Sequence, residues 1–304
     1  MTTNKNKSEQ KIFKFVHPVS GDVFTYEDKK HAYKLNGIDL PGTTTPLKLV
    51  NELSWDADGK MTDKSQIIQQ WAIKLVTNEI LEKTKGDGTY TSYSPEIIKA
   101  IVLEAKKAPN KKFTGAGISG TEIHAGIESI IKKSILENNG IIKYSSSLIF
   151  SLRPQEKNFV DWAINNKVKF LFSEEPIYSK EWMNCGTVDF ICEIDGKVLI
   201  GDIKTNGDKR RYEWNSKTNK YDFSKPVSDI HVPALWQTGA YGKMATEDGA
   251  RKLIDKFDGV VIVNIKKSGE FNEDLDVRFD YNTDSLIRAY DHVIGLYREF
   301  AKKI

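Results

Sequence analysis

The spacing of hydrophobic and polar residues changes several times along the chain, and each change predicts a different kind of element. Between Ile12 and Thr45, short β-like runs are broken by turn residues, and Asn36-Gly37 predicts a tight hairpin. Apolar residues at helical spacing predict helices over Lys64–Lys83, Pro95–Lys107, Thr121–Leu136, Val232–Ala245 and Asp284–Lys303. Strand-like runs cover Lys167–Ser179, Thr187–Ile194, Lys197–Lys204, Gly259–Lys266 and Leu275–Tyr281. The glycine-rich stretch 108–120 is expected to be a flexible, basic linker.

Two of the strand-like runs form a central hairpin, because only Asp195 and Gly196 separate them. Asp-Gly in this setting predicts a type I′ turn, since that turn needs a positive φ at both central residues. A two-residue loop places Asp189 opposite Asp202 on neighbouring strands. Lys204 lies two residues beyond Asp202 and therefore shares its face. A loop of three or four residues with a bulge would change this register.

Two carboxylates that face each other on adjacent strands repel one another. A divalent cation between them is the usual compensation, and a lysine beside them can hold a phosphate or polarise an attacking water. The alternative is a polar sheet face on which both carboxylates are solvated. Ile191, Val198 and Ile200 fall on the same derived face and argue against that alternative. The pattern therefore favours a metal site that includes Asp189 and Asp202.

A series of motifs occurs in a defined order around this hairpin. The motifs are His124 and Glu128 in GTEIHAGIE, Glu174 in SEEPIYS, Gly186-x-x-Asp189, Asp202-x-Lys204, and Gln237 with Tyr241 in QTGAY. This order resembles the PD-(D/E)xK nuclease superfamily, and within it the RecB-like exonuclease branch. The segment His31–Leu47 is also similar to the opening hairpin of phage exonucleases and of the mitochondrial genome maintenance exonuclease. The resemblance thus covers most of the chain.

The resemblance implies a metal-dependent catalytic site. His124, Asp189, Asp202 and the carbonyl of Ile203 would hold one or two Mg²⁺ or Mn²⁺ ions. Lys204 would orient the attacking water and stabilise the transition state. Taken without the resemblance, a histidine beside an apolar helix stripe is usually a packed or capped structural residue.

Four further residues receive supporting roles from the resemblance. Glu128 lies at i+4 from His124 and would join the catalytic set by orienting His124 or a water, although it could simply pair with a surface lysine. Glu174 and Glu175 are adjacent and point to opposite faces, so only one can join the metal face, and the resemblance selects Glu174 as a substrate-binding residue. Gln237 and Tyr241, also four residues apart, would contact substrate or support the metal site. In isolation they would be a routine polar pair.

The fold that the resemblance implies is α/β, with a restriction-endonuclease-like core. That core is a mixed, twisted sheet flanked by helices, with N-terminal β-hairpin and helical elaborations. We expect residues 1–11 to be a disordered arm and residues 12–119 to be a hairpin and helical region packed on the core. Residues 120–304 would form the core, with an inserted hairpin at 206–231.

The inserted segment 206–231 is rich in basic and aromatic residues, among them Arg210, Arg211 and Trp214. Single-stranded nucleic acid needs both kinds, because its phosphates attract positive charge and its unstacked bases stack on flat side chains. The alternative is an ordinary hairpin with solvated charges and aromatics packed on the protein body. We expect these three residues to bind substrate, and single-stranded DNA to be the preferred partner.

Composition excludes several other classes. The 304 residues include 45 basic and 42 acidic ones, so a nucleic-acid site must come from local clustering of charge. The two cysteines, Cys185 and Cys192, cannot ligate the four-cysteine iron–sulfur cluster that some RecB-like nucleases carry. The polar start and the lack of a long apolar run predict neither a signal peptide nor a membrane span. We expect a cytoplasmic protein, in the host cytoplasm if it is phage-encoded.

The expected activity is metal-dependent, exonucleolytic hydrolysis of DNA, with a role in phage recombination, replication or repair by family analogy. One alternative is a catalytically inactive relative that only binds nucleic acid, and the intact set of Asp189, Asp202, Lys204 and His124 argues against it. The other is a double-strand endonuclease, which would act as a dimer and release discrete products. A monomer is favoured, but the sequence leaves the oligomeric state open.

Overall fold

The computed structural model describes residues 12–51, 53–55, 61–84, 95–144, 151–205, 210–215, 220–226 and 232–301. By its internal contacts the chain divides into two compact units, residues 1–49 with 124–304, and residues 50–123. The predicted disordered arm, residues 1–11, lies outside the described residues. The division differs from the expected grouping in one respect, because the N-terminal hairpins share a unit with the C-terminal half of the chain.

A mixed five-stranded sheet lies at the centre of the first unit. Its strands are β7 (Lys169–Ser179), β8 (Asn184–Ile194), β9 (Lys197–Lys204), β12 (Gly259–Asn264) and β13 (Val277–Asp280), in the order β13-β12-β9-β8-β7. β9 and β12 run parallel, and all other neighbours run antiparallel. The continuous apolar run of β12 is buried at every position, as expected for a central strand. The architecture is therefore mixed α/β, as predicted.

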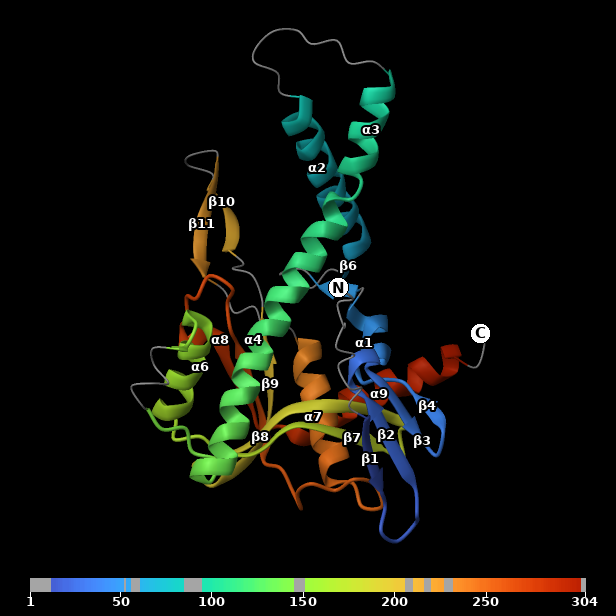
Figure 1. Cartoon of the computed structure of the whole chain (residues 1–304), viewed down its shortest axis with the longest axis vertical. Coiled ribbons are helices and arrows are strands. Elements are labelled where there is room, and N and C mark those ends of the chain that lie inside the picture. Colours follow the sequence, from blue (N-terminus) through green and yellow to red (C-terminus); the bar gives the residue numbers. More distant parts are fainter. Residues whose placement is uncertain are drawn as a thin grey trace, which may run out of the picture. The chain divides into compact units, whose positions relative to one another are not determined.

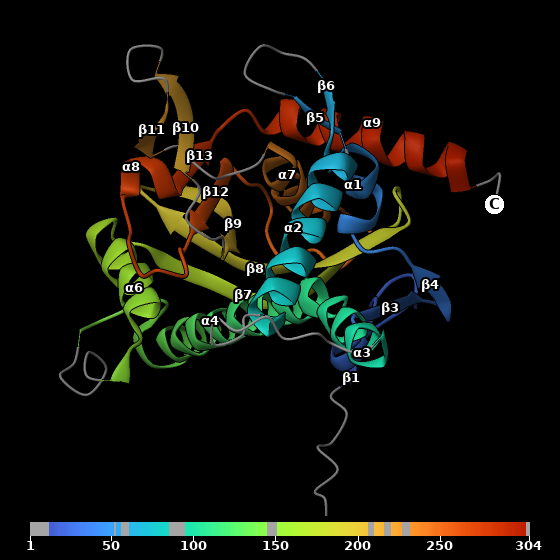
Figure 2. The same ribbon diagram turned by 90° about the horizontal axis from the view of Figure 1, so that it is seen from above.

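Two predicted helices pack on this sheet and on each other. Helix α7 (Val232–Thr246) connects β9 to β12 and packs against β7, β8, β9 and β12. Helix α9 (Thr283–Ala301) packs against α7, and Figure 2 shows both helices on the same side of these strands. The short helix α8 (Glu273–Asp276) precedes the edge strand β13.

Helix α6 (Pro154–Asn165) has no counterpart among the elements expected from the sequence. Its start is stabilised locally, because a proline occupies the first turn and the Glu156 carboxylate accepts a hydrogen bond from the backbone N–H of Arg153 at 2.9 Å. Phe159 of this helix packs edge-on against Phe190 of β8, at 6.0 Å between ring centroids. The helix therefore packs on the central sheet at β8.

An antiparallel four-stranded meander precedes the central sheet (Figure 1). Its strands are β1 (Ile12–Val16), β2 (Val23–Glu27), β3 (Ala32–Leu35) and β4 (Ile38–Leu40), and helix α1 (Thr44–Asn51) follows. The predicted Asn-Gly hairpin is confirmed, because Asn36 and Gly37 have φ of 52° and 82° and Leu35 pairs with Ile38. The meander shares one hydrophobic cluster with Tyr178 of β7 and Cys185 of β8. It is thus an integral part of the first unit.

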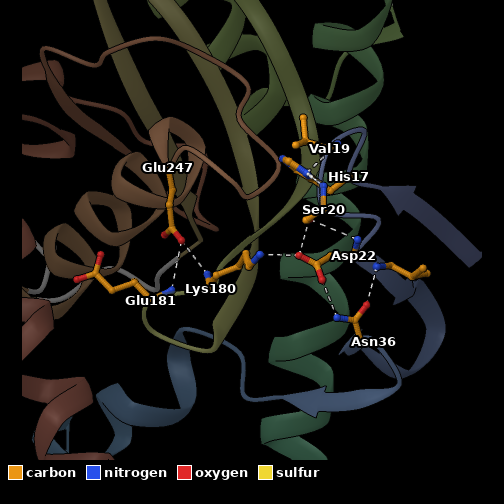
Figure 3. Close-up of polar contacts among 9 residues, drawn as sticks. His17, Val19, Ser20, Asp22, Asn36, Lys180, Glu181 and Glu247 are labelled. Carbon is orange, nitrogen blue, oxygen red and sulfur yellow. Dashed lines mark hydrogen bonds and ion pairs between the residues drawn. The ribbon is translucent and has the colours of Figure 1, made fainter.

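A polar cluster fixes the β1–β2 turn of this meander to the core (Figure 3). The Asp22 carboxylate accepts hydrogen bonds from Asn36 Nδ2 at 2.8 Å and from Lys180 Nζ at 2.5 Å. The backbone N–H of Lys180 donates in turn to Glu247 Oε1, at 2.8 Å. The Lys180 ammonium, together with Ser20 and Asn36, holds the pKa of Asp22 well below its usual range. The cluster therefore links the meander, the β7–β8 connection and the segment after α7.

The second unit contains a short two-stranded sheet and helices. Its elements are β5 (Leu53–Trp55), β6 (Met61–Asp63), α2 (Lys64–Thr84), α3 (Pro95–Ala105) and the start of α4 (Ala108–Asn138), which continues into the first unit from His124. The helices over 64–84 and 95–105 are confirmed.

The expected flexible linker over 108–120 is wrong, because α4 is continuous through it. Pro109 occupies the first turn, where a missing N–H is tolerated. Each interior glycine costs only about 1 kcal/mol relative to alanine, so glycine alone does not end a helix.

The predicted hairpin within 206–231 is confirmed at the level of the backbone. β10 (Arg210–Asn215) and β11 (Lys220–Pro226) form an antiparallel two-stranded sheet. The register pairs Tyr212 with Phe223 and Trp214 with Tyr221, so these four positions fall on one face of the ribbon. No helix among the described residues is long and apolar enough to cross a membrane.

Candidate active site

The central hairpin has the predicted turn and the predicted register. Asp195 and Gly196 have φ of 50° and 74°, as a type I′ turn requires. The pairing runs from Ile194 with Lys197 up to Phe190 with Gly201 and then stops. Continuing the same register by one step places Asp189 and Asp202 opposite each other on one face. The two carboxylates thus stand where the backbone ladder between β8 and β9 ends.

The end of the ladder is filled by a side chain. Asp189 Oδ2 accepts a hydrogen bond from the backbone N–H of Ile203 at 2.7 Å, in place of a carbonyl from β8. Burial and the nearby Asp202 carboxylate raise the pKa of Asp189 to about 7, against the opposing effect of Lys204 and of the Ile203 N–H. Residue 203 therefore contributes its N–H to the site, and the role of its carbonyl as a metal ligand stays a prediction.

Lys204 and Asp202 form a buried ion pair. The Lys204 Nζ lies 2.8 Å from Oδ1 and 2.7 Å from Oδ2 of Asp202, whose side chain is 2% exposed. Burial opposes the charge on Lys204, but the Asp202 and Asp189 carboxylates outweigh it and raise the pKa of the ammonium. The lysine is therefore a fixed, charged group at the site.

Helix α7 contributes the predicted polar pair. Gln237 Oε1 accepts a hydrogen bond from Lys204 Nζ at 3.4 Å, and Gln237 Nε2 donates one to the Tyr241 hydroxyl at 2.8 Å. Gly186 is required here by space, because a Cβ at this position would come within 2.4 Å of the Tyr241 ring. Burial raises the pKa of Tyr241 well above its usual range, so the phenol stays neutral. These two residues support the position of the lysine.

Helix α4 brings His124 to the same place. Its Nδ1 lies 3.9 Å from Asp189 Oδ2. Burial lowers the pKa of His124, which favours the neutral imidazole that binds metals. Glu128, one turn further along α4, forms an ion pair with Lys132. This contact is the pairing with a surface lysine that the sequence left open for Glu128. The Glu128 carboxylate also contributes to the raised pKa values of Asp189 and Glu174.

Glu174 lies on the edge strand β7 in a strained conformation, with φ of 53°. The β7–β8 pairing places Ser173 opposite Phe190 and Glu175 opposite Val188, so Glu174 faces Asp189. Burial, Asp189 and Glu128 raise the pKa of Glu174 to about 8. The predicted separation of the two adjacent glutamates is confirmed, because Glu175 instead binds Arg251 at 2.5 Å.

The donor set suits a divalent cation. Asp202 Oδ2 is buried and has no hydrogen-bond partner among the described residues, and it lies 2.7 Å from the Lys204 ammonium. Asp189 and Glu174 are crowded carboxyls whose raised pKa values a bound cation would reverse. In the part of the chain that the structure describes, no three His, Cys, Asp or Glu side chains are already gathered as a metal site. A cation would therefore have to draw Asp202 away from Lys204.

Some residues of the site have no signal in the local sequence. The Tyr33 hydroxyl of the meander lies 2.9 Å from Thr187 Oγ1, two residues before Asp189 on the same face. Only the similarity of His31–Leu47 to exonuclease hairpins pointed to this region. The predicted substrate contacts Arg210, Arg211 and Trp214 lie in β10, but their side chains are outside the described part of the structure.

No protein-family model matches this sequence, and a search of curated proteins finds no match. The function must therefore be argued from the residues themselves and from their arrangement.

Proposed function

We propose that the protein is a metal-dependent deoxyribonuclease. One observation carries the proposal: His124, Asp189, Asp202 and Lys204 come from a helix and two strands, and they converge where the β8–β9 ladder ends. A purely structural sheet has no need for two facing carboxylates at that position. A lysine beside such a pair matches the requirements of phosphodiester hydrolysis, which needs positive charge around the scissile phosphate.

His124, Asp189 and Asp202 would hold Mg²⁺ or Mn²⁺, with residue 203 adjacent. When bound, the ion would neutralise charge on the phosphate and acidify the attacking water. Lys204 is held by Asp202 and Gln237 and would place its ammonium against a phosphate oxygen or the attacking water. If Asp202 held the ion, Lys204 would keep its contact with Gln237 and could bind a substrate oxygen. Tyr241 holds Gln237 in place for that contact.

The proposed substrate is single-stranded DNA, degraded from an end. The four aromatic positions on one face of the β10–β11 ribbon support this choice, because unpaired bases stack on aromatic side chains. Arg210 and Arg211 at the start of β10 would add phosphate contacts.

One assay tests the reaction class. End-labelled single- and double-stranded DNA is incubated with Mg²⁺, Mn²⁺ or EDTA, with the Asp202→Ala variant as control. Progressive loss of the single strand, dependent on metal and absent in the variant, is the expected result. Discrete products from the duplex would indicate an endonuclease, and no cleavage under any condition would refute the nuclease proposal.

A second assay tests the choice of strand. The double variant Trp214→Ala with Tyr221→Ala should weaken single-strand binding at least about tenfold, since each stacked base contributes about 1–3 kcal/mol. Arg210→Ala with Arg211→Ala should instead flatten the salt dependence of binding. Unchanged affinity together with a lowered melting temperature in the aromatic variant would mean that these residues pack on the protein body.

The second candidate is an inactive relative that binds nucleic acid. The direct ion pair between Lys204 and Asp202 favours it, because that carboxylate is already neutralised without a metal. Tight DNA binding with no response to divalent ions would decide for this candidate.

A further inference from the structure

The connection between β2 and β3 carries a hydrogen-bonded chain of three polar side chains. The Tyr26 hydroxyl donates to Asp28 Oδ1 at 3.0 Å and also lies 3.2 Å from His31 Nδ1. Tyr26 is buried, whereas Asp28 and His31 are exposed. The tyrosine therefore joins a surface carboxylate to a surface imidazole.

These hydrogen bonds determine which ring nitrogen of His31 carries the hydrogen. The Tyr26 proton is given to a carboxylate, which only accepts, so the tyrosine oxygen must accept from His31. Nδ1 of His31 therefore carries the hydrogen, and Nε2 is the nitrogen that can meet a ligand. In a complex with a phosphate, Nε2 would also have to carry a hydrogen, so that it donates to a phosphate oxygen while Nδ1–H keeps its bond to Tyr26.

The chain lies beside the candidate active site. Tyr26 stacks on Tyr33 at 4.6 Å between ring centroids, and the Tyr33 hydroxyl lies 2.9 Å from Thr187 Oγ1. Burial, Asp28 and, more weakly, Glu174 raise the pKa of Tyr26 to about 12, which places Glu174 within electrostatic reach of the phenol. The meander therefore reaches the face of β8 that carries Asp189.

The backbone at His31 is unfavourable for this residue type. The 3₁₀ turn η1 (Asp28–Lys30) ends with His31 at φ of 46° and ψ of 42°, the left-handed conformation that glycine adopts most readily. A histidine held in this conformation is typical of a functional position.

We infer that His31, positioned by Tyr26 and Asp28, is a substrate-binding residue that contacts a phosphate of the DNA strand next to the cleaved bond. The inference rests on the proposed function for the position of that bond. It implies that the N-terminal meander forms one side, or wall, of the DNA-binding surface. The polar cluster around Asp22 and Lys180 at the other end of β2 fixes that wall to the core (Figure 3).

The matched control is His17, a histidine at the opposite end of the same meander. Its Nδ1 accepts from the backbone N–H groups of Ser20 at 3.0 Å and Val19 at 3.3 Å (Figure 3), so its role is local. His31→Ala and His17→Ala change the same residue type in the same substructure.

Binding of a labelled single-stranded oligonucleotide is measured in EDTA, and KM and kcat are measured with Mg²⁺. His31→Ala should weaken binding about tenfold, which is ~1.4 kcal/mol, and raise KM similarly while leaving kcat within about twofold. Tyr26→Phe, which keeps the ring stack but removes the hydroxyl, should show a smaller loss of the same kind. His17→Ala should bind as the wild type does.

His31→Gly keeps the test valid if His31→Ala folds poorly, because glycine accepts the left-handed backbone. It should retain or raise the melting temperature and still lose affinity. Unchanged affinity and KM in both His31 variants, or an equal loss in His17→Ala, would overturn the inference. A wild-type protein that binds DNA but does not cleave it would refute the proposed nuclease, while the binding comparison would still decide the role of His31.

Discussion

Two hairpins of this protein have the same kind of turn but differ in the charged residues that face each other across their strands. Asn36-Gly37 and Asp195-Gly196 both have two positive φ values and both join strands without a further loop residue. In the first, Lys34 faces Asp39 and the two form an exposed ion pair at 3.2 Å. In the second, Asp189 faces Asp202, and the ladder stops before they meet.

This difference in facing charges indicates which hairpin serves only the structure and which serves a function. Opposite charges across a hairpin add a little stability, and like charges subtract it. The exposed β3–β4 hairpin follows that rule. The central β8–β9 hairpin breaks it at a site where burial makes the repulsion more costly, and a lysine and a histidine gather around the break. The hairpin with the candidate active site is therefore distinguished by its facing like charges and not by its turn.

The largest contrast should come from removing one acid from each hairpin. Asp202→Ala should lower cleavage by at least about a hundredfold, the scale on which loss of one electrostatic catalytic group acts, while DNA affinity stays close to wild type. Asp39→Ala should leave cleavage unchanged. Turnover and anisotropy measurements on both variants provide the test, and wild-type turnover in Asp202→Ala would place the chemistry elsewhere.

The pH dependence of metal-free stability should expose the same contrast. Because the folded-state pKa values of Asp189 and Glu174 are raised to about 7 and about 8, the folded protein binds more protons than the unfolded chain between pH 4 and these values. The free energy of unfolding should therefore fall as pH rises through this window.

Asp189→Asn removes one of these groups and should stabilise the metal-free protein at pH 8 by about 2 kcal/mol. Added Mg²⁺ should raise the melting temperature of the wild type at pH 8 and have less effect on the variant. Thermal unfolding at pH 5 and pH 8 measures this, and a wild-type protein that becomes more stable toward pH 8 without metal would contradict it.

The turns themselves should respond alike. A Cβ added at Gly37 or Gly196 meets no atom within 4 Å, so Gly→Ala at either position tests only the positive φ, of 82° and 74°. Each should cost about 1 kcal/mol of stability. Asp195→Asn should preserve both the turn and cleavage, and a severe loss of activity in a folded Asp195→Asn protein would give the turn a role beyond geometry.

The smallest effect should follow from copying the like-charge pair onto the exposed hairpin. Lys34→Asp puts two carboxylates opposite each other at the surface, where solvent screens them. It should cost at most about 0.5 kcal/mol and create no response of the melting temperature to Mg²⁺. A clear metal response in this variant would show that facing carboxylates alone suffice, without burial, histidine or lysine.

Local patterns predicted what depends on near neighbours in the sequence. The Asp-Gly and Asn-Gly turns, the register around Asp195 and the i, i+4 pair of Gln237 and Tyr241 were all available from spacing. Helix α6 also had local signals, with Pro154 in its first turn and Glu156 at its start. Those signals are short, and no long apolar stripe accompanies them.

Contacts between distant parts of the chain could not be read in this way. Tyr33 and Thr187 are 154 residues apart, and nothing in either local sequence indicates that they meet. The ion pair of Lys204 with Asp202 depends on burial, which brings the ammonium onto a carboxylate that the spacing alone assigned to a metal. Residues 108–120 are helical because they form the start of the long helix α4, whose continuation outweighs the glycines.

The hydrophobic cluster shared by the meander and the core has a consequence for synthesis on the ribosome. Phe24 packs against Tyr178 with 4.6 Å between ring centroids, and the Thr43 hydroxyl donates to the carbonyl of Cys185, 142 residues further along the chain. The strands of the meander therefore cannot complete their packing until the nascent chain has grown beyond Cys185. Until then their aromatic side chains lack their final partners, a state that favours aggregation and chaperone binding. The meander is thus made before its packing partners and reaches its native environment only after they have been added.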